Sequence, residues 1–245
     1  MKFTVATVTY NAASELGKTL ASVAAQTYGE VDHLIIDGAS TDSTPALLQQ
    51  WPRVQVLSEP DSGLYDAMNK AIRLAQGDYL LFLNAGDTLH SPTTLEEVAR
   101  TIGKERPAVV YGDTHVVDSE GRFVRRRRLS PPERLTWRSF KWGMLVCHQA
   151  FFVRSDLAKR REYDLKYRLS ADFDWCIRIL KDAGQRGLPN LNTHLVIAHF
   201  VQGGLSKQRH RQSLQERFLI MRHHYGLPAT LALHAFFAIR ALFKH

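Results

Sequence analysis

Short apolar runs alternate with longer amphipathic segments through residues 1–90 of the chain. The apolar runs, at residues 3–9, 34–36, 54–57 and 79–83, have the length and composition of buried strands. The segments between them repeat apolar residues at helical spacing, most clearly over residues 65–76. This alternation predicts an α/β domain in which helices cover both faces of a mostly parallel sheet.

Two helix starts carry capping residues. Ser14 precedes an apolar helix face, and Thr44 followed by Pro45 is typical of an N-cap and a first helical position. After residue 90 the pattern is less regular, and Gly184 ends the one clear helix. The elements expected there are strands at residues 109–117, 122–126, 150–153 and 195–200 and a helix at residues 174–183.

Residues 211–245 read as a helical tail that follows the domain of residues 1–210. A basic amphipathic helix is expected at residues 213–225, with an apolar face made of Leu214, Phe218, Leu219 and Met221. Residues 229–243 are then almost wholly apolar. A helix of that length extends about 22 Å, short of a hydrocarbon core of about 30 Å. We expect it to lie on a membrane surface or to pack on the domain or on a second copy.

The chain has a net charge of +8 and a pI near 9.6, which fits nucleic acid, an anionic membrane or phosphorylated small molecules. The arginine run 125–128 is its densest basic segment, and the alternative for it is a solvated loop. Cys147 and Cys176 lack metal-ligand spacing, and Cys176 is expected to be a buried free thiol. Few cysteines and no signal peptide predict a cytoplasmic protein.

Polar clusters directly follow three of the expected strands, at residues 9–11, 37–42 and 84–87. Ligands of parallel sheets bind beyond the carboxyl ends of the strands, so the clusters predict one site along that edge. Asp37 and Asp87 are the candidate carboxylates. Each has the alternative of a turn residue, because Asp-Gly and Gly-Asp are common turn dipeptides.

The ordered segments 8–11, 22–26, 36–42 and 58–70 resemble the nucleotide-binding half of family 2 glycosyltransferases, and residues 83–87 are similar to their Asp-x-Asp metal motif. Later segments, 147–152 and 199–206, resemble polysaccharide-building members similar to colanic-acid-type transferases. The resemblance implies a Rossmann-like GT-A fold. Within it, residues 1–90 would bind the nucleotide-sugar and residues 91–210 the acceptor.

The resemblance also implies the reaction. An inverting, metal-dependent enzyme would move a sugar from a nucleotide-diphosphate sugar to an acceptor hydroxyl in bacterial surface polysaccharide synthesis. Its cofactor would be Mn²⁺ or Mg²⁺, and its acceptor a saccharide or lipid-linked saccharide. A peripheral location on the inner face of the plasma membrane and a homodimer are further expectations, and no nucleic-acid partner is expected.

On the donor side, the resemblance assigns nucleotide or sugar contacts to Thr9, Tyr10, Asn11, Asp37, Asp66, Lys70 and Asn84. Asp37 would accept a hydrogen bond from a ring N–H of the base. The alternative for Lys70 is a solvated helix lysine. Asn84 replaces the usual first aspartate of the metal motif, so Asp87 would be the main protein carboxylate on the metal.

On the acceptor side, residues 170–175 resemble the segment that carries the catalytic base, with Ala171 in place of the usual glutamate. Asp172 matches the base and Asp174 the second acid, and either could instead cap a helix. His148 and Gln149 belong to segment 147–152, which resembles an acceptor-side strand of the family, and the alternative for His148 is a structural role. His199 would be a ligand of the metal or of the diphosphate.

Three other functions fit parts of the pattern. A dehydrogenase needs a glycine-rich turn after the first strand, and residues 9–13 contain no glycine. A sugar-1-phosphate nucleotidyltransferase would need a glycine- and arginine-rich opening loop, which is also absent. A nucleic-acid-binding module is allowed by the basic charge, but the sequence shows no recognition motif.

Overall fold

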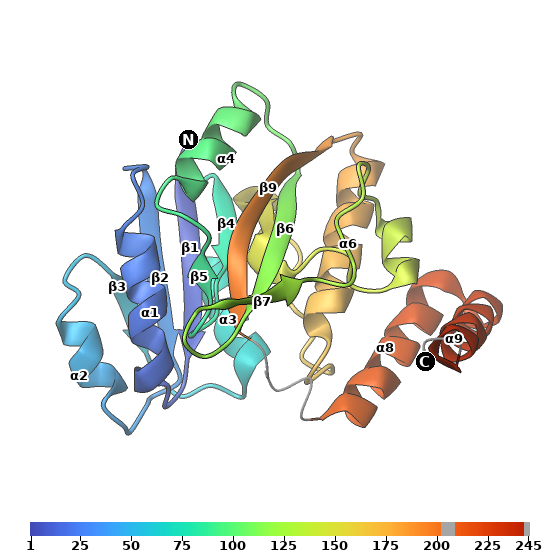
Figure 1. The fold of residues 1–245 in the computed structure, drawn as a ribbon, viewed down its shortest axis with the longest axis horizontal. Helices are drawn as coiled ribbons and strands as arrows, with labels where there is room; N and C mark the ends of the chain where they lie inside the picture. Colours follow the sequence, from blue (N-terminus) through green and yellow to red (C-terminus); the bar gives the residue numbers. More distant parts are fainter. Residues whose placement is uncertain (202–208, 243–245) are drawn as a thin grey trace.

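Nine strands form one sheet in the part of the chain that the computed structural model describes, residues 1–201 and 209–242 (Figure 1). Their order is β3-β2-β1-β4-β8-β6-β9-β5, with β7 paired to β6. The first four strands run parallel to one another, and they are β1 (Phe3–Thr9), β2 (Val31–Asp37), β3 (Gln55–Ser58) and β4 (Tyr79–Phe82). Their carboxyl ends therefore meet at one edge, as the alternating pattern predicted.

The sheet becomes mixed beyond β4. Its remaining strands are β5 (Thr88–Leu89), β6 (Val109–Val117), β7 (Phe123–Arg126), β8 (Phe151–Arg154) and β9 (Asn190–Val201). β8 is antiparallel to both β4 and β6, whereas β6 and β9 are parallel. Residues 118–122 join β6 to β7, which pair antiparallel as the expected strands 109–117 and 122–126, and all four residues of β7 are exposed.

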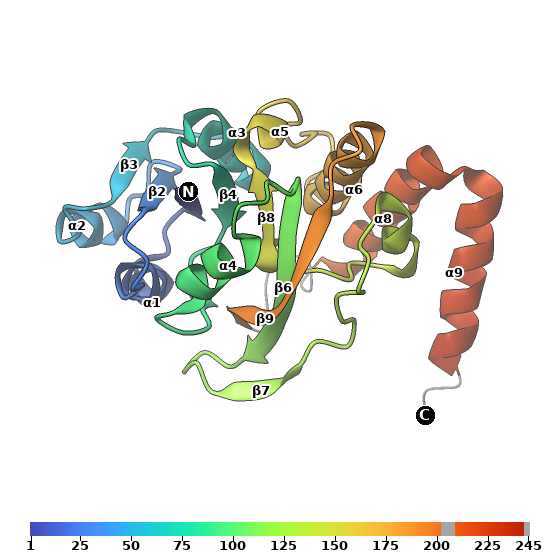
Figure 2. The ribbon, with the colours of Figure 1, turned by 90° about the horizontal axis from the view of Figure 1, so that it is seen from above.

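Helices cover both faces of the sheet (Figure 2). One face carries α1 (Ala13–Ala24), α2 (Thr44–Gln49) and α4 (Thr94–Ile102), and the other carries α3 (Leu64–Leu74), α5 (Ser155–Ala158) and α6 (Ala171–Gln185). Successive side chains of β1 enter opposite cores: Val5 packs with α4, and Ala6 packs with α3 and α6. Two short 3₁₀ helices, η1 (Trp137–Trp142) and η2 (His148–Ala150), precede β8.

The predicted helix starts need correction. α1 begins at Ala13 rather than after Ser14, and α2 begins at Thr44 with Ser43 as its N-cap. The hydroxyl of Thr44 instead accepts the N–H of Ala12 at 3.2 Å, so it connects the turns that follow β1 and β2. Cys176 is a buried free thiol, as expected.

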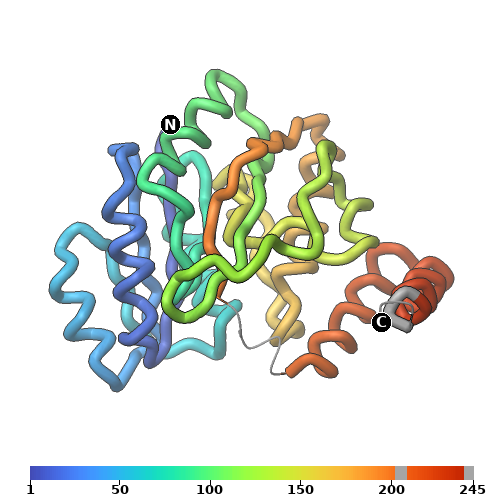
Figure 3. Tube along the Cα trace, in the orientation of Figure 1, coloured from blue at the N-terminus to red at the C-terminus, as the bar shows by residue number. Residues whose placement is uncertain are grey.

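Two helices form the C-terminal tail, α8 (His210–Tyr225) and α9 (Leu227–Leu242). α8 packs on α6 and α9 packs on α8. In Figure 3 both helices lie on the side of the molecule away from the N-terminus. The expected apolar face of α8 is only partly correct, because Leu214 and Leu219 are exposed. The buried positions of α8 are Ser213, Glu216, Ile220 and Met221. Within the described ranges, no helix is both long and apolar enough to cross a bilayer.

The carboxylate of Glu216 explains why a polar side of α8 faces the domain. It accepts the backbone N–H groups of Arg168, Leu169 and Ser170, each at 2.9 Å, immediately before α6. A buried carboxylate with three donors is well satisfied. The hydrogen bonds therefore fix α8 against the segment that leads into α6.

Candidate functional site

Asn11 ties together the two turns that follow β1 and β2. Its side-chain oxygen accepts the N–H groups of Thr41 at 2.8 Å and Asp42 at 3.3 Å. Its own N–H donates to the hydroxyl of Ser40 at 2.8 Å, and its φ is 48°. These bonds hold a left-handed conformation that asparagine tolerates better than most residues. The result is an ordered polar rim at the carboxyl ends of the strands.

Asp37 is fully buried behind this rim. Its carboxylate accepts the N–H of Ser40 at 3.1 Å and the hydroxyl of Ser58 at 2.6 Å. Tyr10 is 63% exposed. Its ring lies close to Gly38, the residue after Asp37, because a Cβ atom on Gly38 would lie 3.3 Å from it. An exposed aromatic ring therefore stands beside a buried, hydrogen-bonded carboxylate. Thr9 is buried next to them, and its hydroxyl has no partner in the described part of the chain.

Asp66 and Lys70 both hold the segment before α3. Asp66 accepts the N–H of Ser62 at 2.9 Å, while Lys70 donates to the carbonyl of Pro60 at 2.7 Å and pairs with Glu59 at 2.8 Å. These contacts explain the local structure. The place of both residues beside a diphosphate stays a prediction.

Asp87 and Gln149 meet where β4 ends. The carboxylate of Asp87 accepts Nε2 of Gln149 at 2.6 Å and the N–H of Val201 at 3.0 Å. Burial raises the pKa of Asp87 to about 6, although both hydrogen bonds act in the opposite direction. Asn84 lies in the same turn, and its Nδ2 is 3.2 Å from Nε2 of His148.

Asp172 connects to this turn through His148. At the start of α6 its Oδ1 accepts the hydroxyl of Tyr65 at 3.1 Å, and its Oδ2 lies 3.6 Å from Nδ1 of His148. Burial acts to raise the pKa of Asp172, but His148 and the charge of Arg217 outweigh it, so the net shift is downward. Asn84, His148 and Asp172 thus form a continuous chain of contacts ending in an ionised carboxylate.

Tyr65 and Arg217 act on Asp172, one by a hydrogen bond and the other by its charge, and the sequence analysis did not single them out. Tyr65 lies within the family-like segment 58–70, so the resemblance offered a signal for it. Arg217 belongs to α8, and its Nε atom is buried without a hydrogen-bond partner in the described chain. No spacing rule relates a residue of the tail to the start of α6.

Asp174 does not join the contact chain of Asp172. Its carboxylate accepts Nε of Arg178 at 2.6 Å and Nε2 of His224 at 2.7 Å, and its side chain is 4% exposed. His224 belongs to α8, so this buried cluster fastens the tail to α6. These contacts form a structural link between the two helices, and the acceptor contact expected for Asp174 stays a prediction.

His199 lies on β9 with its ring against two other histidines, His90 and His115. The pKa of His199 is lowered, mainly by burial and further by the charges of His90 and His115. The structure records no hydrogen bond between His199 and Asp87. A shared metal with Asp87 therefore stays a prediction from resemblance.

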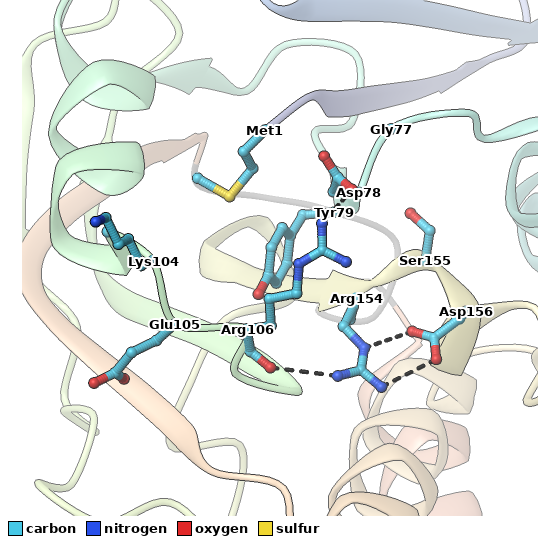
Figure 4. Close-up of a pocket in the computed structure, with 11 residues that line it drawn as sticks. Met1, Gly77, Asp78, Tyr79, Lys104, Glu105, Arg106, Arg154, Ser155 and Asp156 are labelled. Carbon is cyan, nitrogen blue, oxygen red and sulfur yellow. Dashed lines mark hydrogen bonds and ion pairs between the residues drawn. The ribbon is translucent and has the colours of Figure 1, made fainter.

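A cavity of about 790 Å³ lies at the edge of the sheet where β1 and β4 begin, opposite the carboxyl ends of the parallel strands (Figure 4). Four of its charged side chains form ion pairs: Arg154 binds Asp156, and Arg106 lies 3.6 Å from Asp78. Ligands of this sheet type bind beyond the carboxyl ends of the strands. The carboxyl edge, with its polar turns, therefore remains the candidate site.

The sequence profile of glycosyl transferase family 2 matches residues 4–161, well over half of the chain. The chain belongs to glycosyltransferase family 2. A PGL/p-HBAD biosynthesis glycosyltransferase of Mycobacterium bovis (strain BCG / Pasteur 1173P2) is 36% identical over 212 residues, covering 83% of this chain and 78% of the relative. The family resemblance noted in the sequence is confirmed, and the rival interpretations lose their support.

Two solved structures are similar in fold to this glycosyltransferase. S. aureus TarS 1-349 has a TM-score of 0.71 at 18% identity, covering 91% of this chain and 66% of TarS. The mannosyltransferase PcManGT from Pyrobaculum calidifontis has a TM-score of 0.59 at 17% identity, covering 99% and 81%. At these identities the likeness concerns the fold alone, and it confirms the GT-A architecture.

Proposed function

We propose that this glycosyltransferase moves a sugar from a nucleotide-diphosphate sugar to an acceptor hydroxyl, with inversion at the anomeric carbon. The observation that carries the proposal is the contact chain Asn84–His148–Asp172. It brings a candidate base next to the strand-end motif that follows β4. A donor held at that motif and an acceptor beside Asp172 would be neighbours.

The donor would lie across the carboxyl ends of β1, β2 and β4. TarS has been solved in complex with UDP and with UDP-GlcNAc, and PcManGT with GDP-Man and Mn²⁺. By analogy, we assign the binding of the nucleotide's base to Thr9, Asn11 and Asp37. The exposed ring of Tyr10 offers it a stacking surface. Asp66 and Lys70 would stand near the diphosphate or the sugar.

Asn84 and Asp87 fit a hard divalent cation, Mn²⁺ or Mg²⁺, which prefers oxygen ligands. Oδ1 of Asn84 is buried and has no hydrogen-bond partner among the described residues. Each carboxylate oxygen of Asp87 accepts one hydrogen bond, which leaves lone pairs for a ligand. When bound, the cation would offset the negative charge of the diphosphate leaving group.

Asp172 would act as the general base. Its carboxylate would take the proton of the acceptor hydroxyl while that oxygen bonds to the anomeric carbon and the bond to the diphosphate breaks. Attack from the face opposite the leaving group inverts the anomeric centre. Tyr65 and His148 orient the carboxylate, and the lowered pKa of Asp172 keeps it ionised and able to accept a proton.

A thermal-shift screen of nucleotide-sugars with and without Mn²⁺ tests the proposed function. A ligand at 100 times its Kd adds about 2.7 kcal/mol of stability, which corresponds to a rise of several degrees in Tm. We expect one class of nucleotide to raise Tm, and Mn²⁺ to increase the effect. Hydrolysis of the same nucleotide-sugar would then identify the donor. A Tm raised by oligonucleotides but by no nucleotide-sugar would contradict the proposal.

We further propose that the acceptor is lipid-linked and that α9 docks the enzyme on an anionic membrane surface. Four apolar residues of α9, Leu227, Leu231, Phe236 and Ile239, are each at least 46% exposed. In Figure 2, α9 stands at the outer end of the molecule and contacts mainly α8. The exposed basic side chains of α8, such as Arg222, could meet anionic headgroups.

Replacing Leu231, Phe236 and Ile239 together by glutamate is expected to abolish co-sedimentation with anionic liposomes at low salt. The change removes apolar surface and adds charge on the docking face. The matched control replaces three apolar residues that are similarly exposed elsewhere, Val56, Leu74 and Leu165, by glutamate. The membrane proposal fails if the wild type stays in the supernatant. A wild-type dimer that the triple variant turns into a monomer would assign the face to a second copy.

A further inference from the structure

Three histidines meet on the sheet outside the proposed reaction centre. His90 follows β5, His115 lies in β6 and His199 lies in β9. One ring nitrogen from each lies within 4.8 Å of the other two, and Nδ1 of His90 is 2.8 Å from Nε2 of His199. In residues 1–201 and 209–242, these three alone among histidine, cysteine and acidic side chains form a group with that spacing.

Backbone pairing holds the three side chains together. His115 and His199 are partners in the parallel β6–β9 ladder, so both side chains project from the same face of the sheet. Their rings lie parallel to within 9°, with centroids 6.1 Å apart. The N–H of His90 donates to the carbonyl of Ile197 at 2.9 Å, which fixes His90 beside β9. The ring of Phe123 packs edge-to-face against His115, with the two ring centroids 4.8 Å apart.

Three imidazoles in this arrangement are a ligand set for a transition metal. Zn²⁺ binds histidine nitrogen at about 2.0–2.1 Å and commonly combines three protein ligands with one water. Nitrogen atoms spaced as these are can reach one ion with small rotations of the rings. His90 is exposed, so solvent has access for the fourth ligand. Mn²⁺ and Mg²⁺ prefer oxygen, which distinguishes this set from Asn84 and Asp87.

We propose that His90, His115 and His199 bind one Zn²⁺ ion at a site separate from the donor-binding carboxylate. The ion joins β5, β6 and β9 beside the segments that hold Asp87. His90 is three residues beyond Asp87, and His199 is two residues before Val201, whose N–H donates to Asp87. An ion that binds only the folded chain stabilises it, so Zn²⁺ raises Tm and fixes these strands.

Titrating the full-length protein with Zn²⁺, after treatment with EDTA and dialysis, tests the site. We expect one equivalent to bind by calorimetry and Tm to rise with bound Zn²⁺. The variants His90→Gln, His115→Gln and His199→Gln are each expected to weaken the affinity by about 100-fold or more. Co²⁺ in place of Zn²⁺ should show the visible absorption of a four-coordinate site. His194→Gln is the matched control, because His194 is an exposed histidine of the same strand, β9.

The variant Asp87→Asn separates the Zn²⁺ site from the proposed donor-binding cation, because we expect this variant still to bind Zn²⁺. Zn²⁺ binding that disappears in Asp87→Asn but survives in His90→Gln would overturn the proposal. So would equal Zn²⁺ binding by the wild type and all three histidine variants, or no one-equivalent transition in the wild type. Melting in EDTA controls for folding, and His90→Gln should match the wild type there because its side chain is exposed.

Discussion

Replacing Asp172 by asparagine is expected to slow sugar transfer by about 100-fold or more and to leave nucleotide binding unchanged. The amide keeps the size of the side chain and can still accept the hydrogen bond from Tyr65. It cannot take a proton from the acceptor hydroxyl. Steady-state kinetics with the donor found by the screen would measure kcat, and calorimetry would measure affinity for the nucleoside diphosphate. A kcat near that of the wild type would remove Asp172 as the base.

Asp174→Asn is the matched control, because it makes the same chemical change in the same turn of α6. The carboxylate of Asp174 binds Arg178 and His224, and its loss leaves the half-buried guanidinium of Arg178 without its charged partner. We therefore expect a lower Tm for Asp174→Asn and a nearly normal kcat at low temperature. Equal loss of kcat in both variants at an unchanged Tm would show that the two carboxylates act together in the reaction.

The parallel half of the sheet was predictable because its central strands are buried on both faces. Every residue of β1 and β4 is buried, so their apolar runs mark strands without any alternation of polar residues. The parallel order then brings the turns that follow these strands to one edge. For that reason the neighbourhood of Asn11, Asp37 and Asn84 could be predicted before any contact was known.

Partners that lie far apart along the chain were not predictable. Asp172 and Asp174 are two residues apart at one helix start, and both suit either a base or a cap. The fold separates their roles: Asp172 faces His148, while Asp174 faces His224 of the tail. Likewise, the ring neighbours of His199 come from two other parts of the sheet. Periodicity reports which side of an element is apolar, and it does not report which distant polar group that side will meet.

Asp87→Asn is expected to remove the Mn²⁺-dependent part of nucleotide binding. Asp87 is the carboxylate of the proposed cation site, and losing a direct ligand should cost at least the roughly 10–100-fold seen for residues that only support ligands. Calorimetry of a nucleoside diphosphate with and without Mn²⁺ measures the effect. The affinity without Mn²⁺ is the internal control, since it should be the same in both proteins. Equal Mn²⁺-dependent affinity in the variant would place the cation elsewhere.

The raised pKa of Asp87 gives this prediction a pH dependence with a definite sign. Burial raises the pKa of Asp87 to about 6, so the carboxyl gains a proton as the pH falls through that value. A protonated carboxyl binds a cation poorly, because the proton competes with the metal for the same oxygen. The Mn²⁺-dependent affinity of the wild type for the nucleotide should therefore fall as the pH is lowered from about 7 to about 5. Ionised Asp87 also costs stability, because its folded pKa lies above the ordinary 3.8. The protonated carboxyl therefore stabilises the fold: this contribution is present in full below pH 3.8 and is lost as the pH rises through about 6. Asp87→Asn should flatten both the pH profile of Mn²⁺-dependent affinity and the pH profile of stability.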